Sequence, residues 1–160
     1  MGTIAFRDFL AKKATEQNHP QRKERRDEWI ASVEGLFDQI RTWLTESDPD
    51  RFLDILPFKI HTSEPALGNY EISALKIGVG DAAVEVRPMG RDALGLIRRG
   101  SGGDELRAEG RVDINAGGRK YILYRSLQGG RETWYALDEN FRPRPFDRTE
   151  LEAILQDLLS

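Results

Sequence analysis

Apolar residues near the N-terminus recur every three or four positions, which is the spacing of one buried helical face. The pattern predicts a short helix within IAFRDFLAKKATEQN, residues 4–18, and a longer helix from Pro20 to about Glu46. His19 and Pro20 separate the two, because proline disfavours a helical residue before it and suits the first turn of a new helix. We therefore expect His19 to cap the second helix or to lie on the surface. The apolar stripe of the longer helix consists of Trp29, Ile30, Val33, Leu36, Phe37, Ile40, Trp43 and Leu44.

Two parts of this helical region have no obvious place in a core. Residues 21–28, QRKERRDE, are charged on every side, so we expect them to project into solvent or to meet a partner. The short first helix is marginal on its own, because isolated helices of about twelve residues are barely stable in water. Its apolar residues Phe6, Phe9 and Leu10 must therefore bury on the sheet or on a second copy of the chain.

The C-terminal residues 147–159 carry the signals of a closing helix. Asp147 and Glu150 have the spacing of a capping box, in which side chains satisfy backbone N–H groups at the start of a helix. Phe146 and Leu151 stand where a hydrophobic staple would place them. The RPRP segment just before the helix predicts an extended connector.

Between the helical ends, residues 52–138 alternate between short apolar runs and glycine-containing turns. This pattern is typical of antiparallel strands joined by tight connections, and no connection is long enough for a parallel crossover. The predicted strands are FLDILPFKIHT, NYEISALKIGV, AAVEVRP, LGLIR, LRAEGRVDIN, KYILYRSL and ETWYALD.

The alternation changes phase within NYEISALKIGV, near Ser73. A β-bulge there would keep Tyr70 and Ile72 on the same face as Leu75 and Ile77. We therefore predict a bulge in this strand.

These elements predict an α+β fold in a single domain, residues 1–160. Residues 1–50 form a helical segment, residues 51–140 form a six- or seven-stranded antiparallel meander sheet, and residues 147–159 close the fold. A sheet with one apolar face needs a cover, and the segment Trp29–Leu44 is long enough to provide it. We expect both N-terminal helices and the C-terminal helix to pack on a half-barrel-like sheet.

Composition narrows the function classes. The 160 residues include 39% hydrophobic and 32% charged residues, and the net charge of −3 does not favour a general nucleic-acid binder. The chain has no cysteine, which excludes disulfides, thiolate metal sites, iron–sulfur clusters and cysteine nucleophiles. No apolar run reaches the roughly 20 residues of a membrane span, and the N-terminus does not resemble a secretory signal. These features predict a soluble, cytoplasmic protein that takes no cofactor and binds no membrane.

The stretch LIRRGSGGDEL, residues 96–106, invites comparison with phosphate-binding loops. A dinucleotide-binding fingerprint requires glycine where Glu105 stands, and a P-loop requires a Gly-Lys pair, which the chain lacks. The residues that follow are strand-like, so no helix N-terminus is available to hold an anion. We expect a hairpin connection, with Arg98 and Arg99 as candidate contacts for a partner.

Candidate catalytic groups are few. His61 is expected near the end of the first strand, with Glu64 three residues on, and such a pair can serve as base and orienter. The serines show no nucleophile-elbow motif, and two histidines without cysteine disfavour a zinc site. We therefore expect His61 to face solvent.

The clustered carboxylates do not predict a metal site. The segment ESDPDRFLD, residues 46–54, lacks the alternating oxygens and the glycine of a calcium loop, and it predicts a helix stop and a turn. Asp81, Glu85 and Arg87 follow the order of a metal-dependent nuclease motif. Arg87 stands at the lysine position of that motif, however, and a guanidinium is a poor proton shuttle.

The second half of the chain is locally basic. Residues 91–148 hold 12 Arg or Lys against 9 Asp or Glu, an excess of +3. Aromatic residues lie among these cations, an arrangement found where nucleobases stack on an open sheet face. Charge on the outer face of a one-sided sheet is also ordinary, and charge protects strand edges from aggregation. The candidate binding residues are Arg98, Arg99, Arg125, Tyr124, Tyr135 and His61.

The sequence leaves three functions open. The leading hypothesis is a non-enzymatic binding protein that acts through protein–protein contacts, either with a second copy as a homodimer or with another protein. The sequence offers no nucleophile with a base, no metal set and no phosphate loop. The second hypothesis is an accessory nucleic-acid-binding protein that uses the Arg- and Tyr-rich sheet face. The third is a divergent hydrolase or nuclease with His61 or Glu85 in its site.

Overall fold

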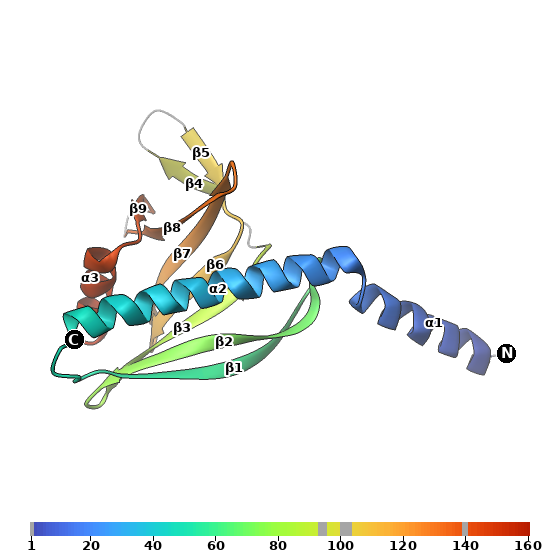
Figure 1. Ribbon diagram of the computed structural model, residues 1–160, viewed down its shortest axis with the longest axis horizontal. Helices are drawn as coiled ribbons and strands as arrows, with labels where there is room; N and C mark the ends of the chain where they lie inside the picture. The colour runs from blue at the N-terminus through green and yellow to red at the C-terminus, as the bar shows by residue number, and fades with distance from the viewer. Residues whose placement is uncertain (1, 93–95, 100–103, 139–140) are drawn as a thin grey trace.

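The computed structural model describes residues 2–92, 96–99, 104–138 and 141–160. Within these residues the chain forms two helices, a series of strands and a closing helix, so the predicted α+β order is confirmed (Figure 1). The helices are α1 (Gly2–Gln17), α2 (Pro20–Ser47) and α3 (Arg148–Leu158). The strands are β1 (Asp54–Glu64), β2 (Gly68–Val79), β3 (Ala82–Gly90), β4 (Leu96–Arg99), β5 (Asp104–Arg107), β6 (Arg111–Ala116), β7 (Arg119–Gln128), β8 (Arg131–Leu137) and β9 (Pro143–Pro145).

Seven strands of the described chain form one open antiparallel sheet in the order β1-β2-β3-β6-β7-β8-β9. The predicted strand LGLIR does not join this sheet, because its residues in β4 pair with β5 in a separate two-stranded hairpin. The predicted strand LRAEGRVDIN is divided between β5 and β6, since Gly110 between them takes a φ of +151°. The RPRP connector contributes the edge strand β9, which pairs with β8.

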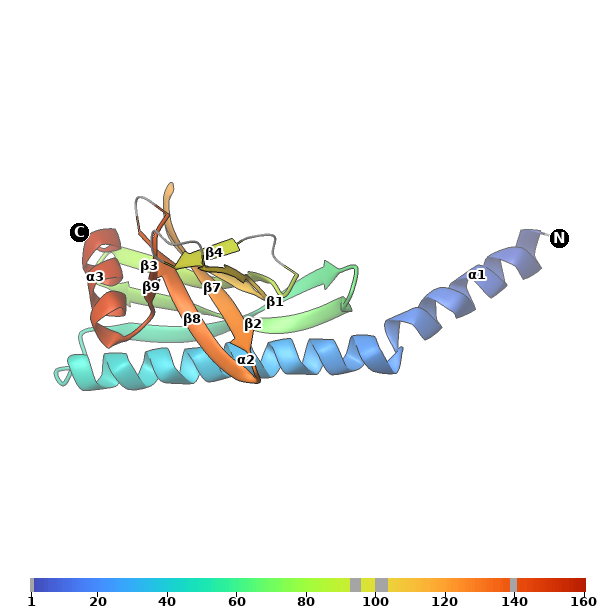
Figure 2. The ribbon, with the colours of Figure 1, turned by 90° about the horizontal axis from the view of Figure 1, so that it is seen from above.

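The helix α2 lies along one face of the sheet, as the two ribbon views show (Figures 1 and 2). Trp29 and Ile40 on this helix are fully buried in one apolar cluster with side chains of the sheet. Leu151 of α3 joins the same cluster, and the Trp43 and Phe146 rings meet edge-on with centroids 5.6 Å apart. Burial of each large apolar side chain stabilises the fold by about 1.5–3 kcal/mol. The prediction that the segment from Trp29 covers the sheet is therefore confirmed.

The caps predicted for α2 and α3 are both formed. His19 Nδ1 accepts a hydrogen bond of 3.2 Å from the Gln21 N–H at the start of α2. Asp147 Oδ1 accepts a hydrogen bond of 2.8 Å from the Glu150 N–H at the start of α3. Each bond satisfies an N–H that a helix start leaves unpaired.

The predicted bulge near Ser73 is wrong. β1 and β2 pair residue for residue along the whole of β1, without a register shift. Ile72 and Leu75 of β2 still belong to one core, despite their odd spacing. Ile55 and Ile60 of β1 pack against that core with the same change of phase, so the two strands bend together and no extra residue is needed.

The two edges of the main sheet differ in length. β1 is an 11-residue edge strand, whereas β9 has 3 residues, two of them proline. Proline cannot donate a backbone hydrogen bond, so the β9 edge is poorly suited to pairing with another strand. Among the described residues, no helix has the length and apolar character needed to cross a bilayer.

Candidate functional site

The helix α1 extends away from the sheet, and neither ribbon view shows a described element beside its N-terminal half (Figures 1 and 2). Its apolar side chains remain exposed: 62% of Phe6, 52% of Phe9 and 49% of Leu10. The Phe6 and Phe9 rings stack with centroids 6.4 Å apart. We call Phe6, Phe9 and Leu10 the α1 contact face. The prediction left two covers open for these side chains, and the sheet does not cover them.

The C-terminal end of α1 is attached to the turn between β1 and β2. Gln17 Nε2 donates to the Asn69 carbonyl at 2.8 Å, and Gln17 Oε1 accepts from the Asn69 N–H at 2.9 Å. From α2, Arg26 Nη1 donates to the carbonyls of Gln17 at 2.7 Å and Leu67 at 3.1 Å. Gly68 permits this close contact, since a Cβ there would lie 2.2 Å from Gln17 Oε1. These bonds fix the direction of α1 from its base.

The charged segment QRKERRDE supplies part of this attachment, so the prediction that it projects into solvent or meets a partner is wrong for several of its residues. Arg22 Nη2 donates to the Pro65 carbonyl at 2.5 Å, and Arg26 bonds as described above. Glu28 takes part in a buried ion pair. Arg25 differs, because it has no hydrogen bond or ion pair with any described residue.

A hollow of about 280 Å³ lies where α1 meets α2. Lys13 contacts both the α1 contact face and a residue of this hollow. Its ammonium lies 5.9 Å from the Phe9 ring centroid and 3.4 Å from Glu16 Oε2. Glu16 is itself part of the hollow, so Lys13 lies between the apolar face and the hollow. We call it the junction hollow, and its lining residues are Glu16, His19, Gln21, Arg22 and Arg25.

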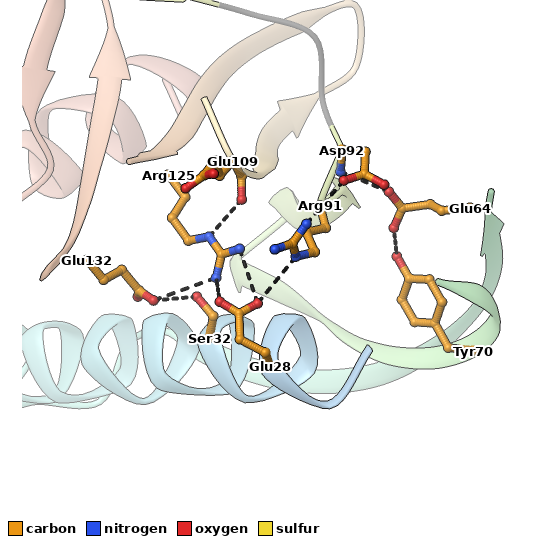
Figure 3. Close-up of polar contacts among 9 residues, drawn as sticks. All are labelled: Glu28, Ser32, Glu64, Tyr70, Arg91, Asp92, Glu109, Arg125 and Glu132. Atoms are coloured by element: carbon orange, nitrogen blue, oxygen red, sulfur yellow. Dashed lines mark hydrogen bonds and ion pairs between the residues drawn. The ribbon is translucent and has the colours of Figure 1, made fainter. Parts of the chain in front are cut away.

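A buried arginine joins α2 to β7 further along the core (Figure 3). The Arg125 side chain is fully buried, and its Nη1 donates to Glu28 Oε1 at 2.7 Å. Its Nε donates to the Glu109 carbonyl at 2.8 Å, and Glu132 Oε2 lies 3.8 Å from Nη1. The guanidinium carbon also lies 4.9 Å from the Trp29 ring centroid, within the range of a cation–π contact. The charge of Arg125 is thus compensated inside the protein.

The same network continues to the turn between β1 and β2 (Figure 3). Arg91 Nε lies 3.5 Å from Glu28 Oε2, and Arg91 Nη1 lies 3.2 Å from Asp92 Oδ1. Glu64 accepts from the Asp92 N–H at 3.1 Å and from the Tyr70 hydroxyl. Burial and the Glu64 carboxylate raise the pKa of the Tyr70 hydroxyl, so the hydroxyl stays protonated as a donor. These hydrogen bonds and ion pairs form a network that connects α2 to the ends of two strands.

His61 does not have the partner expected from the sequence. Its Nε2 lies 3.4 Å from Glu71 Oε1 across the β1–β2 pair, while Glu64 bonds to Tyr70 and Asp92. The His61 side chain is 85% exposed, so it faces solvent as predicted. A shallow hollow of about 590 Å³ beside it is lined by His61, Thr62, Ser63, Asn69, Tyr70 and Glu71. No hydrogen bond joins Ser63 to His61 among the described side chains, so the geometry does not form a nucleophile with its base.

The structure separates the candidate sheet-face residues instead of bringing them together. Tyr124 and Tyr135 are cross-strand neighbours, each 8% exposed, in a small cluster with Ala108. Arg125, the residue after Tyr124, points to the opposite face and contacts α2. Arg111 lies beside the tyrosines, and its pKa is raised chiefly by its hydrogen bonds to Asp113. Neither buried tyrosine offers an open ring for stacking.

The two remaining candidate binding residues lie on the β4–β5 hairpin. Arg98 and Arg99 lie on β4, opposite Glu105 and Asp104 of β5, and their side chains fall outside the described part of the structure. The predicted hairpin connection at residues 100–103 also lies outside it. Within the described ranges, no group of three or more His, Cys, Asp or Glu residues is arranged to hold a metal ion.

Sequence reasoning missed most of the residues that organise α1 and the network. Arg125 shares an inward face with Leu123 because strand residues alternate, and a basic residue at such a position signals a buried ion pair. No local signal identifies the bond between Gln17 and Asn69, which joins residues 52 positions apart.

No protein-family model, no curated protein and no solved structure matches this chain.

Proposed function

We propose that this chain is a non-enzymatic binding protein that acts through protein–protein contacts, with the α1 contact face as its binding surface. The observation that carries the proposal is the exposure of Phe6, Phe9 and Leu10 together on one helix. Contiguous exposed apolar side chains are uncommon on soluble proteins and mark surfaces that bind a partner. Aromatic residues are also enriched among the side chains that dominate binding energy.

The attachment of α1 supports the same proposal. Gln17 and Arg26 hold the base of the helix with side-chain hydrogen bonds, so the contact face is presented in a set direction. A binding element that is ordered before it meets its partner loses less conformational entropy on binding. The contact residues follow the i, i+3, i+4 spacing by which one helix inserts its anchors into an apolar groove.

A double substitution tests this function. We expect the wild type to self-associate in light scattering or to retain a partner from a lysate of its source, and Phe6→Ser with Phe9→Ser to abolish both. The matched control is Phe52→Ser with Leu56→Ser, since these side chains are also exposed, at 71% and 59%, but lie away from α1. A strictly monomeric wild type that retains nothing, or an unchanged Phe6/Phe9 variant, would contradict the proposal.

A further inference from the structure

Building on this proposed function, we propose that the partner is a second copy of this chain. The two α1 helices pack antiparallel, and Phe6 of each copy is seated at the junction hollow of the other. A two-fold axis then makes the same contact twice, which is the usual geometry of a homodimer.

The continuity between the contact face and the junction hollow supports this arrangement. Lys13 links Phe9 to Glu16 through contacts of 5.9 Å and 3.4 Å, and Glu16 lines the hollow. Phe6 and Glu16 are separated by about 15 Å along a helix that rises about 1.5 Å per residue. An antiparallel partner with its axis near Ala11 therefore places its own Phe6 beside Glu16. The hollow of about 280 Å³ is large enough to accept an aromatic ring.

The charges along α1 favour the antiparallel orientation. With the two-fold axis at the level of Ala11, Lys13 lies opposite Phe9 of the second copy, where its ammonium can contact the aromatic ring. The lysine on this face therefore meets an aromatic ring and not a like charge. A parallel pair in register would instead place Lys13 of one copy beside Lys13 of the other, and this like-charge repulsion costs free energy. It would also leave both hollows empty.

The junction hollow also offers unpaired positive charge. Arg25 lines the hollow and has no hydrogen bond or ion pair with any described residue. The guanidinium of Arg25 can lie against the ring of an incoming phenylalanine as a cation–π contact. The hollow thus complements the N-terminal half of α1 from a second copy.

Sedimentation equilibrium over a wide concentration range tests self-association. A contact confined to one helix and its base is at the small end of specific interfaces, so we expect a weak, concentration-dependent dimer. Phe6→Ser with Phe9→Ser should lower the association constant at least tenfold, while Phe52→Ser with Leu56→Ser should leave it unchanged. A wild type that is monomeric at every concentration would overturn the inference.

The two proposals fail in different ways. A monomeric wild type that still captures a different protein through Phe6 and Phe9 overturns the second copy and leaves the binding function intact. A monomeric wild type whose α1 binds anionic lipid vesicles, and no protein, contradicts both.

Disulfide trapping tests the orientation, since the chain has no cysteine of its own. Ala5→Cys chains mixed with Glu16→Cys chains should form an interchain disulfide, because an axis near Ala11 brings these two positions together. Either variant alone should remain uncross-linked, since its two copies of the cysteine lie about 15–18 Å apart at 1.5 Å per residue, well beyond disulfide reach. Failure of the mixed variants to cross-link, in a sample that sedimentation shows to be dimeric, would overturn the proposed geometry.

Discussion

Arg125 on β7 and Glu28 on α2 lie 97 positions apart in the sequence and form a hydrogen-bonded ion pair of 2.7 Å. Arg125 is fully buried, whereas Glu28 keeps 40% of its side chain exposed. This pair fixes the N-terminal part of the covering helix on the sheet, close to the point where α1 departs. The ion pair therefore connects the part of α2 next to the base of α1 with the core of the sheet.

Removing the carboxylate of this pair should be strongly destabilising. Glu28→Leu leaves the buried Arg125 cation with Glu132 at 3.8 Å as its nearest remaining ion-pair partner. We expect the free energy of unfolding to fall by about 3 kcal/mol, the low end of the range for breaking a buried ion pair, because Glu132 still compensates part of the Arg125 charge. Urea denaturation measures this change.

Replacing both partners of the pair should cost less than the sum of the single replacements. Glu28→Leu with Arg125→Met removes the uncompensated charge, so the coupling in a double-mutant cycle should exceed about 1 kcal/mol. Arg148→Met is the control, because its exposed pair with Glu46 at 3.2 Å should contribute less than about 1 kcal/mol. Strict additivity at Glu28 and Arg125 would show that the pair does not couple.

Gly110 should tolerate no side chain. Its φ is +151°, and a Cβ built there would lie 2.4 Å from the Trp29 ring. Gly110→Ala should therefore lower the free energy of unfolding by about 1–3 kcal/mol through overpacking and backbone strain. Gly118 has nothing within 4 Å of the same position, so Gly118→Ala is the matched control and should change stability little. Thermal unfolding compares the two, and equal melting temperatures would contradict the prediction.

Asp157 should stabilise the fold above pH 3.8 and lose this contribution in stronger acid. Hydrogen bonds from Tyr121 and Arg119 lower the pKa of this carboxyl below its ordinary value of 3.8. The folded state therefore holds the proton less tightly than the unfolded state, and the stabilisation is present above pH 3.8 and lost as the pH falls through the lowered pKa. The difference in unfolding free energy between the wild type and Asp157→Asn should shrink over that range.

Partner substitutions separate the two causes of this pKa shift. Tyr121→Phe should reduce the pH dependence more than Arg119→Met does, because the Tyr121 hydrogen bond of 2.6 Å has the larger effect. Urea denaturation at a series of pH values measures both. A larger effect of Arg119→Met would reverse this assignment.

Arg51 adopts a left-handed backbone conformation with φ +56° in the turn before β1. Glycine has no Cβ to oppose this conformation, so Arg51→Gly should leave the unfolding free energy unchanged or raise it by up to about 1 kcal/mol. Arg51→Val should lower it by about 1–2 kcal/mol, because a β-branched residue is strongly disfavoured at positive φ. A valine variant as stable as the glycine variant would contradict this account.

The local elements of the fold were predictable because their signals lie close together in the sequence. The cap at His19, the cap at Asp147 and the stripe that begins at Trp29 each depend on residues within one or a few turns, and all three are confirmed. The β4–β5 hairpin was not foreseen as separate from the sheet. Its separation depends on the break at Gly110 and on the direct pairing of β3 with β6. That pairing joins strands that are not consecutive in the sequence, so no local signal predicts it.

The candidate site was predictable only in part. The sequence identified Phe6, Phe9 and Leu10 as side chains in need of a cover, because a short helix with an apolar stripe is marginal alone. It did not reveal the bonds of Gln17 that set the direction of α1. It also placed Arg125 among surface candidates, although an inward strand position beneath α2 buries it completely.

The sequence by itself determined where the helices lie, which face of each is apolar and that the middle of the chain pairs as antiparallel strands. Periodicity, capping residues and turn residues act over a few positions, so they can be read along the chain. Only the tertiary structure decided that Arg125 meets Glu28 and that α1 departs from the core with its phenylalanines uncovered. Those outcomes depend on how the bent sheet and the long helix meet, which is set by the sum of contacts between segments far apart in sequence.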